Sequence, residues 1–96
     1  MVAAKIDREQ ASLQAVGRLA NLSAREREVL NGLVDGHPNK VIAGGLGISV
    51  RTVEVHRARM LQRLGTRRLA DAIRLAVMAS LADQPLPDLP LPTEGQ

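Results

Sequence analysis

The residues best suited to chemistry in this chain lie between Val50 and Arg68, where six arginines accompany a single acid, Glu54. Arginine side chains present several donors in a planar fork that suits phosphate groups. A basic cluster of this kind indicates a polyanionic partner, although a solvated helix face kept for solubility can have the same composition. The elements that position the arginines therefore decide between these two interpretations.

The arginines fall within a series of helical patterns. Ser23 and Glu26 match the S-x-x-E capping box, in which each side chain accepts a hydrogen bond from the other residue's backbone, and this predicts a helix that starts at Ser23. Gly36, followed by His37 and Pro38, is expected to end it. The inward face of this first helix is predicted to consist of Val29, Leu30, Leu33 and Val34.

Three more helices follow at short intervals. Asn39 is expected to cap the second helix, and Ser49 to cap a third that runs from Val50 to about Leu64 and ends at Gly65. The fourth helix is expected from about residue 68 to residue 82. A tight helix-turn-helix whose second member is short and basic is a device for placing side chains in the major groove of DNA.

Gly44 and Gly45 stand inside the second predicted helix, where each glycine costs about 1 kcal/mol relative to alanine. Close approach of the third helix or of a phosphate would explain them. Simple tolerance by a short packed helix would explain them equally well, and both interpretations stay open.

The third predicted helix has two unlike sides. One side carries Val53, Met60, Leu61 and Leu64 and is expected to pack on the first two helices. The opposite side is mixed, and on a merely solvated face its Val55 and Ala58 would gain nothing. Small apolar groups can contact a thymine methyl, and a carboxylate can accept from a cytosine amino group. We therefore expect base contacts from Glu54, Val55, Ala58 and Arg51.

Affinity for DNA would come mainly from phosphates. Donors near helix N-termini, or on the flanks of the base-facing side, can meet backbone oxygens, and helix N-termini add free amides and partial positive charge. The residues expected to contact phosphates are Asn39, Lys40, Thr52, His56, Arg57 and Arg59. Strong salt dependence is expected for such contacts.

The fourth predicted helix has two apolar sides. Leu69, Ala72, Ile73, Ala76 and Val77 are expected to close the core. A second stripe, rotated well away from the first, is the kind of surface through which a symmetric partner is recruited. It predicts a homodimer on DNA with the interface residues Leu75, Met78, Ala79 and Ala82.

The composition argues against several classes of function. The 96 residues suffice for one small domain, and the absence of cysteine removes disulfides, thiolate zinc sites and cysteine nucleophiles. Neither His37 nor His56 has companion ligands at a suitable spacing, so no metal or other cofactor is expected. Ser23 and Ser49 are explained as caps, and no catalytic set is visible, so we expect no enzyme and no small-molecule ligand.

The absence of Phe, Tyr and Trp disfavours a protein that binds RNA or single strands through base stacking. No apolar run approaches the roughly 20 residues that cross a bilayer, and no secretory signal is apparent. The sequence is therefore expected to be soluble and cytoplasmic, with no membrane partner.

Three segments are expected in an all-α chain. Residues 1–21 carry a weak helical pattern and are expected to form an appended or linker helix; residues 22–82 form the helix-turn-helix domain. Residues 83–96 contain four prolines and are expected to be disordered, with a proline-rich docking ligand as the alternative.

The motif pattern resembles the LuxR/NarL/FixJ-type DNA-binding domain over about residues 22–82. The resemblance rests on Leu22-Ser23-x-Arg25-Glu26-x-Glu28-Val29-Leu30, on Asn39-Lys40-x-Ile42-Ala43-x-x-Leu46-x-Ile48-Ser49, and on Thr52-Val53-x-Val55-His56. Leu61-x-x-Leu64-Gly65 completes it, and the run from Arg51 to Ala58 is most similar to the FixJ-like branch.

The resemblance implies a four-helix effector domain of a bacterial transcription regulator, usually the output half of a two-component response regulator. It places Glu54, Val55 and Ala58 at base-facing positions, and Lys40, Thr52, His56 and Arg57 at or beside backbone-contacting ones. It assigns the region from Leu75 to Met78 to the dimerising helix and residues 5–20 to a linker. RNA polymerase is a further candidate partner.

The chain also departs from the family pattern. Val41 replaces a common polar residue, and no phosphoacceptor domain precedes Leu22. The chain is thus expected to be either an excised effector domain or a stand-alone regulator. Two alternative functions stay open: the promoter-binding domain of a sigma factor, and a helical protein-interaction module whose arginines are only solvated.

Overall fold

The computed structural model describes the backbone of residues 2–83 and the side chains of residues 9–81. Within this part of the chain all regular structure is helical, as the sequence predicted. The helices are α1 (Val2–Leu19), α2 (Ala24–Val34), α3 (Asn39–Leu46), α4 (Val50–Leu64) and α5 (Leu69–Asp83). α5 includes Asp83, the first residue of the predicted tail, and residues 84–96 lie outside the described residues.

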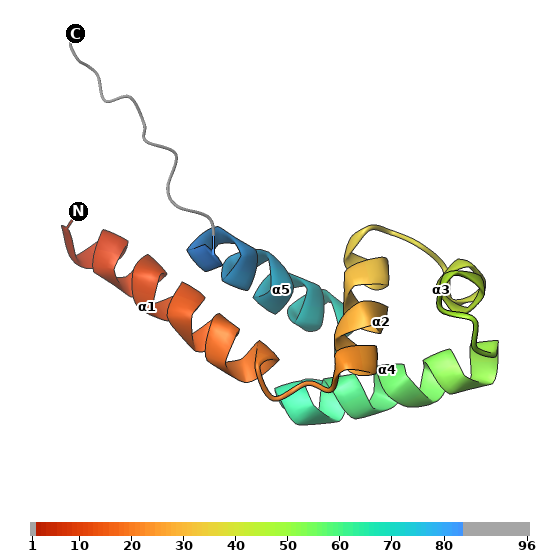
Figure 1. Ribbon diagram of the computed structural model, residues 1–96. Coiled ribbons are helices and arrows are strands. Elements are labelled where there is room, and N and C mark those ends of the chain that lie inside the picture. The colour runs from red at the N-terminus through yellow and green to blue at the C-terminus, as the bar shows by residue number, and fades with distance from the viewer. Residues whose placement is uncertain (1, 84–96) are drawn as a thin grey trace, which may run out of the picture.

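The molecule is elongated, with extents of 54 × 25 × 19 Å. At one end α1 and α5 lie side by side and run in opposite directions, and this is the most extensive contact between any two helices (Figure 1). At the other end α3 crosses the N-terminal part of α4, and α2 stands between the two ends. α3 and the N-terminal part of α4 thus lie away from the α1–α5 pair, whereas the C-terminal end of α4 reaches it.

The core lies where α2, α3, α4 and α5 meet. Leucine, isoleucine, valine, methionine and alanine fill it without any aromatic side chain, which suits closely packed helices. Its buried members are Leu22, Val29, Leu30, Leu33, Ile42, Ala43, Val53, Met60, Leu64 and Ala72. Because these helices share one core, the inner side of α4 is fixed against α2 and α3.

Gly32 permits the close approach of α2 and α3. A Cβ atom at this position would lie 2.7 Å from Cγ1 of Ile42, which is closer than real Cβ contacts allow. Any side chain at residue 32 would therefore push α3 away from α2 and disturb the packing of Ile42 in the core.

The predicted caps of α2 and α4 are confirmed. The amide of Glu26 donates to Oγ of Ser23 at 3.1 Å, and the amide of Ser23 donates to Oε1 of Glu26 at 3.1 Å, which completes the capping box. At α4 the amide of Thr52 donates to Oγ of Ser49 at 3.0 Å. Each bond satisfies a donor that the helix itself leaves without a partner.

The predicted cap of α3 is wrong. Asn39 is the first residue of the helix, and Pro38 takes the cap position in extended geometry, with no side-chain hydrogen bond. Proline at this position supplies a fixed φ of −74° but no hydrogen-bonding side chain. The N-terminal amides of α3 are therefore not satisfied by a capping side chain.

Two predicted core residues are exposed instead. Val34 at the end of α2 is 37% exposed and Val77 on α5 is 47% exposed. Helical spacing gave both residues an inward position, but each lies at the edge of its apolar stripe, where a small rotation of the helix turns the side chain to solvent. Ile73 and Ala76 are half-buried, while Ala72 is fully buried.

The weak helical pattern near the N-terminus corresponds to a complete helix, α1, longer than the predicted residues 5–20 at its start. Ala15 on α1 is fully buried, and Ala79 on the neighbouring α5 is 6% exposed. Leu13 on this helix is 66% exposed. No helix in the described residues is long and apolar enough to span a membrane.

Candidate nucleic-acid interface

The exposed side of α4 carries the residues that the sequence assigned to base contacts. Val53, Met60 and Leu64 are buried against the rest of the domain. Arg51, Glu54, Val55 and Ala58 are all exposed on the opposite side. Val55, at 37%, is one of the large hydrophobic side chains that the fold leaves exposed. Since packing does not use this side, its residues are available to an external partner.

Arg51 and Glu54 form an ion pair on this exposed side. Nη1 of Arg51 lies 3.7 Å from Oε1 of Glu54, and the two side chains are 85% and 51% exposed. A pair this open is screened by water and contributes little to stability. Either side chain can therefore leave this ion pair for a hydrogen bond to a base edge at little cost in free energy.

The N-terminus of α4 lies beside these residues and offers donors for a phosphate. Ser49 Oγ lies 2.9 Å from Oγ1 of Thr52, so the two hydroxyls form one polar cluster at the start of the helix. Lys40 in the first turn of α3 and Arg59 in the middle of α4 are exposed, and Arg57 and Thr52 are half-buried. The two helix N-termini add partial positive charge.

The other two predicted phosphate donors each have a buried polar atom. Asn39 and His56 are half-buried. Among the described side chains, Oδ1 of Asn39 and Nδ1 of His56 are buried polar atoms without a hydrogen-bond partner. His37 is exposed, and the described residues contain no group of three metal-ligating side chains.

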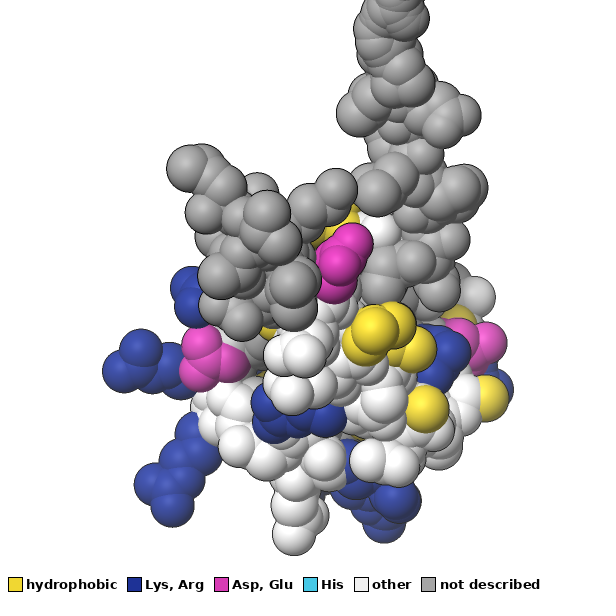
Figure 2. All heavy atoms as spheres, turned by 90° about the vertical axis from the view of Figure 1, so that its left-hand side faces the viewer, with side chains coloured by type: hydrophobic (Ala, Val, Ile, Leu, Met, Phe, Trp, Pro, Cys, Tyr) yellow, Lys and Arg dark blue, Asp and Glu magenta, His cyan; other side chains and the backbone are white. Residues whose placement is uncertain are grey.

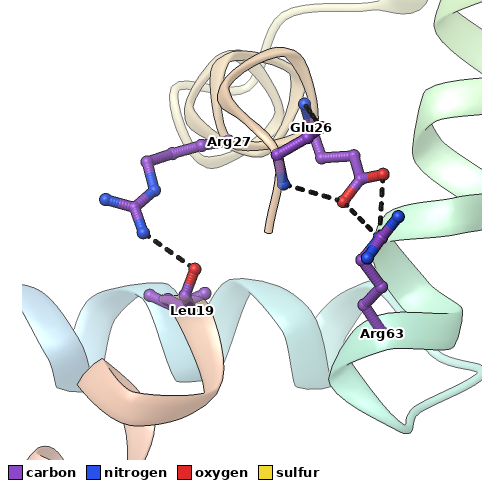
Figure 3. A network of polar contacts seen from close by, with 5 residues as sticks. Leu19, Glu26, Arg27 and Arg63 are labelled. Carbon is purple, nitrogen blue, oxygen red and sulfur yellow. Dashed lines mark hydrogen bonds and ion pairs between the residues drawn. The ribbon is translucent and has the colours of Figure 1, made fainter. Parts of the chain in front are cut away.

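A polar network holds the other end of α4. The carboxylate of Glu26, a residue only 2% exposed, accepts a hydrogen bond from Nε of Arg63 through Oε2 at 3.1 Å, and its Oε1 forms an ion pair with the same nitrogen at 2.9 Å (Figure 3). The same Glu26 carboxylate serves the capping box of α2. The start of α2 is thereby fixed to the last turn of α4.

The charged residues of α2 pair both within the helix and with distant parts of the chain. Arg25 does pair with Glu28 at 3.0 Å on the surface. Glu26 instead pairs with Arg63, and Nη2 of Arg27 donates to the carbonyl oxygen of Leu19 at 2.8 Å, at the end of α1 (Figure 3). Helical spacing does not reveal partners this far away in the chain, so the sequence pattern could not identify either contact.

Three of the residues predicted for the homodimer are wholly or partly covered in the fold. Leu75 and Met78 are half-buried, Ala79 is buried, and the side chain of Ala82 is outside those described. Leu75 and Met78 line a groove of about 290 Å³ at the junction with Arg18. In the end-on view of α1 and α5, visible hydrophobic side chains form small separate patches, and Lys and Arg side chains project around the rim (Figure 2).

Comparison with known proteins identifies the domain. Residues 20–76 match the family described as bacterial regulatory proteins, luxR family. The chain belongs to the luxR family. This luxR-family match covers α2, α3 and α4 and most of α5, which are the elements that carry the exposed side of α4. The predicted DNA-binding function without enzymatic activity is thereby confirmed, and so is the resemblance to the FixJ-like branch that the sequence motifs indicated.

The luxR-family domain is similar to several transcription regulators. It is 46% identical to the transcriptional regulatory protein FixJ of Azorhizobium caulinodans over 74 residues, and 46% identical to that of Rhizobium meliloti over 77 residues. These alignments cover 77% and 80% of this chain but 35% and 37% of the relatives. The chain thus spans little more than a third of their length.

A solved structure shares the arrangement of the helices. Full-length FixJ from B. japonicum superposes with a TM-score of 0.73 at 38% identity, covering 80% of this chain and 38% of that one. The luxR-family domain is therefore the DNA-binding part of a transcription regulator.

Proposed function

We propose that this domain binds double-stranded operator DNA sequence-specifically, with α4 in the major groove. Glu54, Val55, Ala58 and Arg51 contact base edges in this proposal. The observation that carries it is the exposed Val55 and Ala58 on a helix side that the core does not use. These residues are not part of the core, and they suit contact with a thymine methyl.

Phosphate contacts position the helix. Lys40, Thr52, Arg57 and Arg59 lie on α3 and α4 with donors near the two helix N-termini, and Asn39 and His56 complete the set from half-buried positions. These contacts carry affinity but no sequence information. Binding should weaken steeply as salt rises, because each neutralised phosphate releases counterions.

The second part of the proposal is assembly. We infer that two copies bind a two-fold symmetric operator, with Leu75, Met78, Ala79 and Ala82 of α5 as the pairing surface. Since α1 packs along α5 and Ala79 is already buried, α1 must shift or join the interface when two copies meet. Crosslinking on an operator duplex tests this: a single protein per site would exclude the homodimer.

The relatives support a proposal about the type of regulator to which this domain belongs. Similarity to FixJ and to the C4-dicarboxylate transport transcriptional regulatory protein DctR of Rhodobacter capsulatus supports the effector part of a two-component response regulator in the bacterial cytoplasm. In that role RNA polymerase is a further partner, recruited or blocked at the promoter.

Selection of bound duplexes from a random pool gives the operator on which two variants separate base contacts from phosphate contacts. Val55→Arg should lower affinity for the selected duplex by roughly 30-fold or more, because an arginine replaces a small apolar contact. Arg57→Ala should weaken binding to every duplex and reduce the salt slope by about 1. If both variants bind selected and random duplexes like the parent protein, α4 is not the helix in the groove.

A further inference from the structure

The C-terminal end of α4 is held by a residue outside the segment that matches the luxR family. The guanidinium of Arg18 on α1 donates a hydrogen bond to the carbonyl oxygen of Leu64, the last residue of α4. The family match begins at residue 20, so Arg18 precedes it. The contact links the proposed recognition helix to a helix that lies outside the matched segment.

This hydrogen bond satisfies an acceptor that α4 cannot satisfy itself. The last four carbonyl groups of a helix have no partner within it. The amides of Gly65 and Thr66 donate to the carbonyl oxygens of Gln62 and Leu61, both at 3.1 Å, as the chain turns at Gly65 with φ 72°. The positive charge of Arg18 is also favourable beside the negative end of the helix dipole.

The position of Arg18 depends on how α1 packs. Ala15, one turn earlier, is fully buried, and α1 lies along α5 over an extensive contact. Nη2 of Arg27 on α2 holds the carbonyl oxygen of Leu19, the last residue of α1, at 2.8 Å. Arg18 Nη2 would also lie 3.4 Å from a Cβ atom at Gly65, so the guanidinium fits against the turn that follows α4.

We propose that Arg18 is a positioning residue for DNA recognition: it transmits the placement of α1 against α5 to the C-terminal end of α4. Leu64 and Ala58 are separated by about 9 Å along the helix axis at 1.5 Å per residue. A shift at Leu64 therefore tilts the helix and moves the base-facing residues. The inference rests on the proposed function, because the tilt matters only if α4 contacts bases.

Arg18→Ala, compared with Arg25→Ala, tests the inference directly. Both substitutions remove one arginine, but Arg25 pairs with Glu28 on the surface of α2. We expect Arg18→Ala to lower affinity for the selected duplex roughly threefold to tenfold, the range that corresponds to losing one net hydrogen bond. Affinity for a random duplex and the salt slope should remain as in the parent protein, and Arg18→Lys should restore most of the loss.

The hydrogen bond between Arg18 and Leu64 can also be tested without DNA. Amide hydrogen exchange at Gly65 and Thr66 should become faster in Arg18→Ala and stay unchanged in Arg25→Ala. Ala15→Glu, which introduces a charge where α1 packs on α5, should reproduce the faster exchange although residue 15 is on another helix. Gln14→Glu adds the same charge at an exposed position of α1 and should have no effect.

The possible results separate the inference from the function on which it rests. If Arg18→Ala matches Arg25→Ala in specific affinity, or lowers all affinities and the salt slope together, Arg18 is not a positioning residue. The second result would instead make it a phosphate contact. If the parent protein does not discriminate between duplexes, the proposed function fails. Exchange at Gly65 and Thr66 then decides by itself whether Arg18 holds the end of α4.

Discussion

Two glutamate–arginine pairs in this domain have the same chemistry and opposite surroundings. Glu26 is almost fully buried and binds Arg63 across the fold, whereas Glu54 and Arg51 pair on the open side of α4 at 3.7 Å. The first carboxylate accepts from both a backbone amide and a guanidinium. The second carboxylate is exposed to solvent and pairs with an exposed arginine.

The difference shows how one helix serves two purposes. The charge at the C-terminal end of α4 is used to fix the helix to α2. The charges near its N-terminal end are not needed for folding, so they are available to DNA. A buried and fully hydrogen-bonded pair resists exchange, because removal of one partner leaves a polar group without compensation. An exposed pair exchanges partners at little cost.

The largest expected effect concerns the buried pair. Glu26→Ala should lower the free energy of unfolding by about 2–3 kcal/mol, since it removes half of the α2 capping box, the bond to Arg63 and a buried side chain. Urea denaturation followed by circular dichroism measures the change.

Glu28→Ala is the matched control, because Glu28 pairs with Arg25 on the surface of the same helix. It should change the free energy of unfolding by no more than about 0.5 kcal/mol. Equal midpoints for the two variants would mean that Glu26 does not connect α2 to α4.

The exposed pair should behave in the opposite way. Glu54→Ala should leave stability within about 0.5 kcal/mol of the parent protein and should lose about 1–2 kcal/mol of discrimination at one base pair. Competition binding with single-base-pair variants of the selected operator measures this loss. A uniform change across all variants of the operator would place Glu54 away from the bases.

Much of the fold was predictable because its signals are local. The S-x-x-E box at Ser23 and Glu26, the serine before α4 and the glycine after it each act on the nearest turn. The bounds of α4 therefore agree with the prediction. A local signal failed at Asn39. Asparagine is preferred at the cap position, but Pro38 occupies that position of α3.

The contacts between distant segments were not predictable from spacing. Glu26 and Arg63, which pair, are 37 positions apart in the sequence. Arg18 and Leu64, which share a hydrogen bond, are 46 positions apart. The burial of Ala79 depends on the packing of α1 against α5, and the sequence indicated α1 only by a weak helical pattern. The need for glycine at residue 32 becomes visible only when Ile42 is placed beside it. The side of α4 that faces outward was predictable, because its apolar stripe left only one opposite side.

The smallest expected effect extends the comparison to α3. A Cβ atom at Gly44 or Gly45 would meet nothing within 4 Å, so close approach of α4 does not explain these glycines. Gly44→Ala and Gly45→Ala should therefore each raise the free energy of unfolding by about 1 kcal/mol, because alanine loses less backbone entropy in a helix. Gly36→Ala, at a φ of 84°, is the contrasting control and should destabilise the domain.

The same two variants test whether the outer side of α3 is free or is used by DNA. If the short helix merely tolerates the glycines, affinity for the operator should be unchanged while stability rises. If a phosphate approaches the α3 backbone closely, the added methyl group should lower affinity in spite of the gain in stability. Opposite signs for folding and binding at these positions would extend to α3 the separation between folding and recognition that we propose for the two glutamates on α2 and α4.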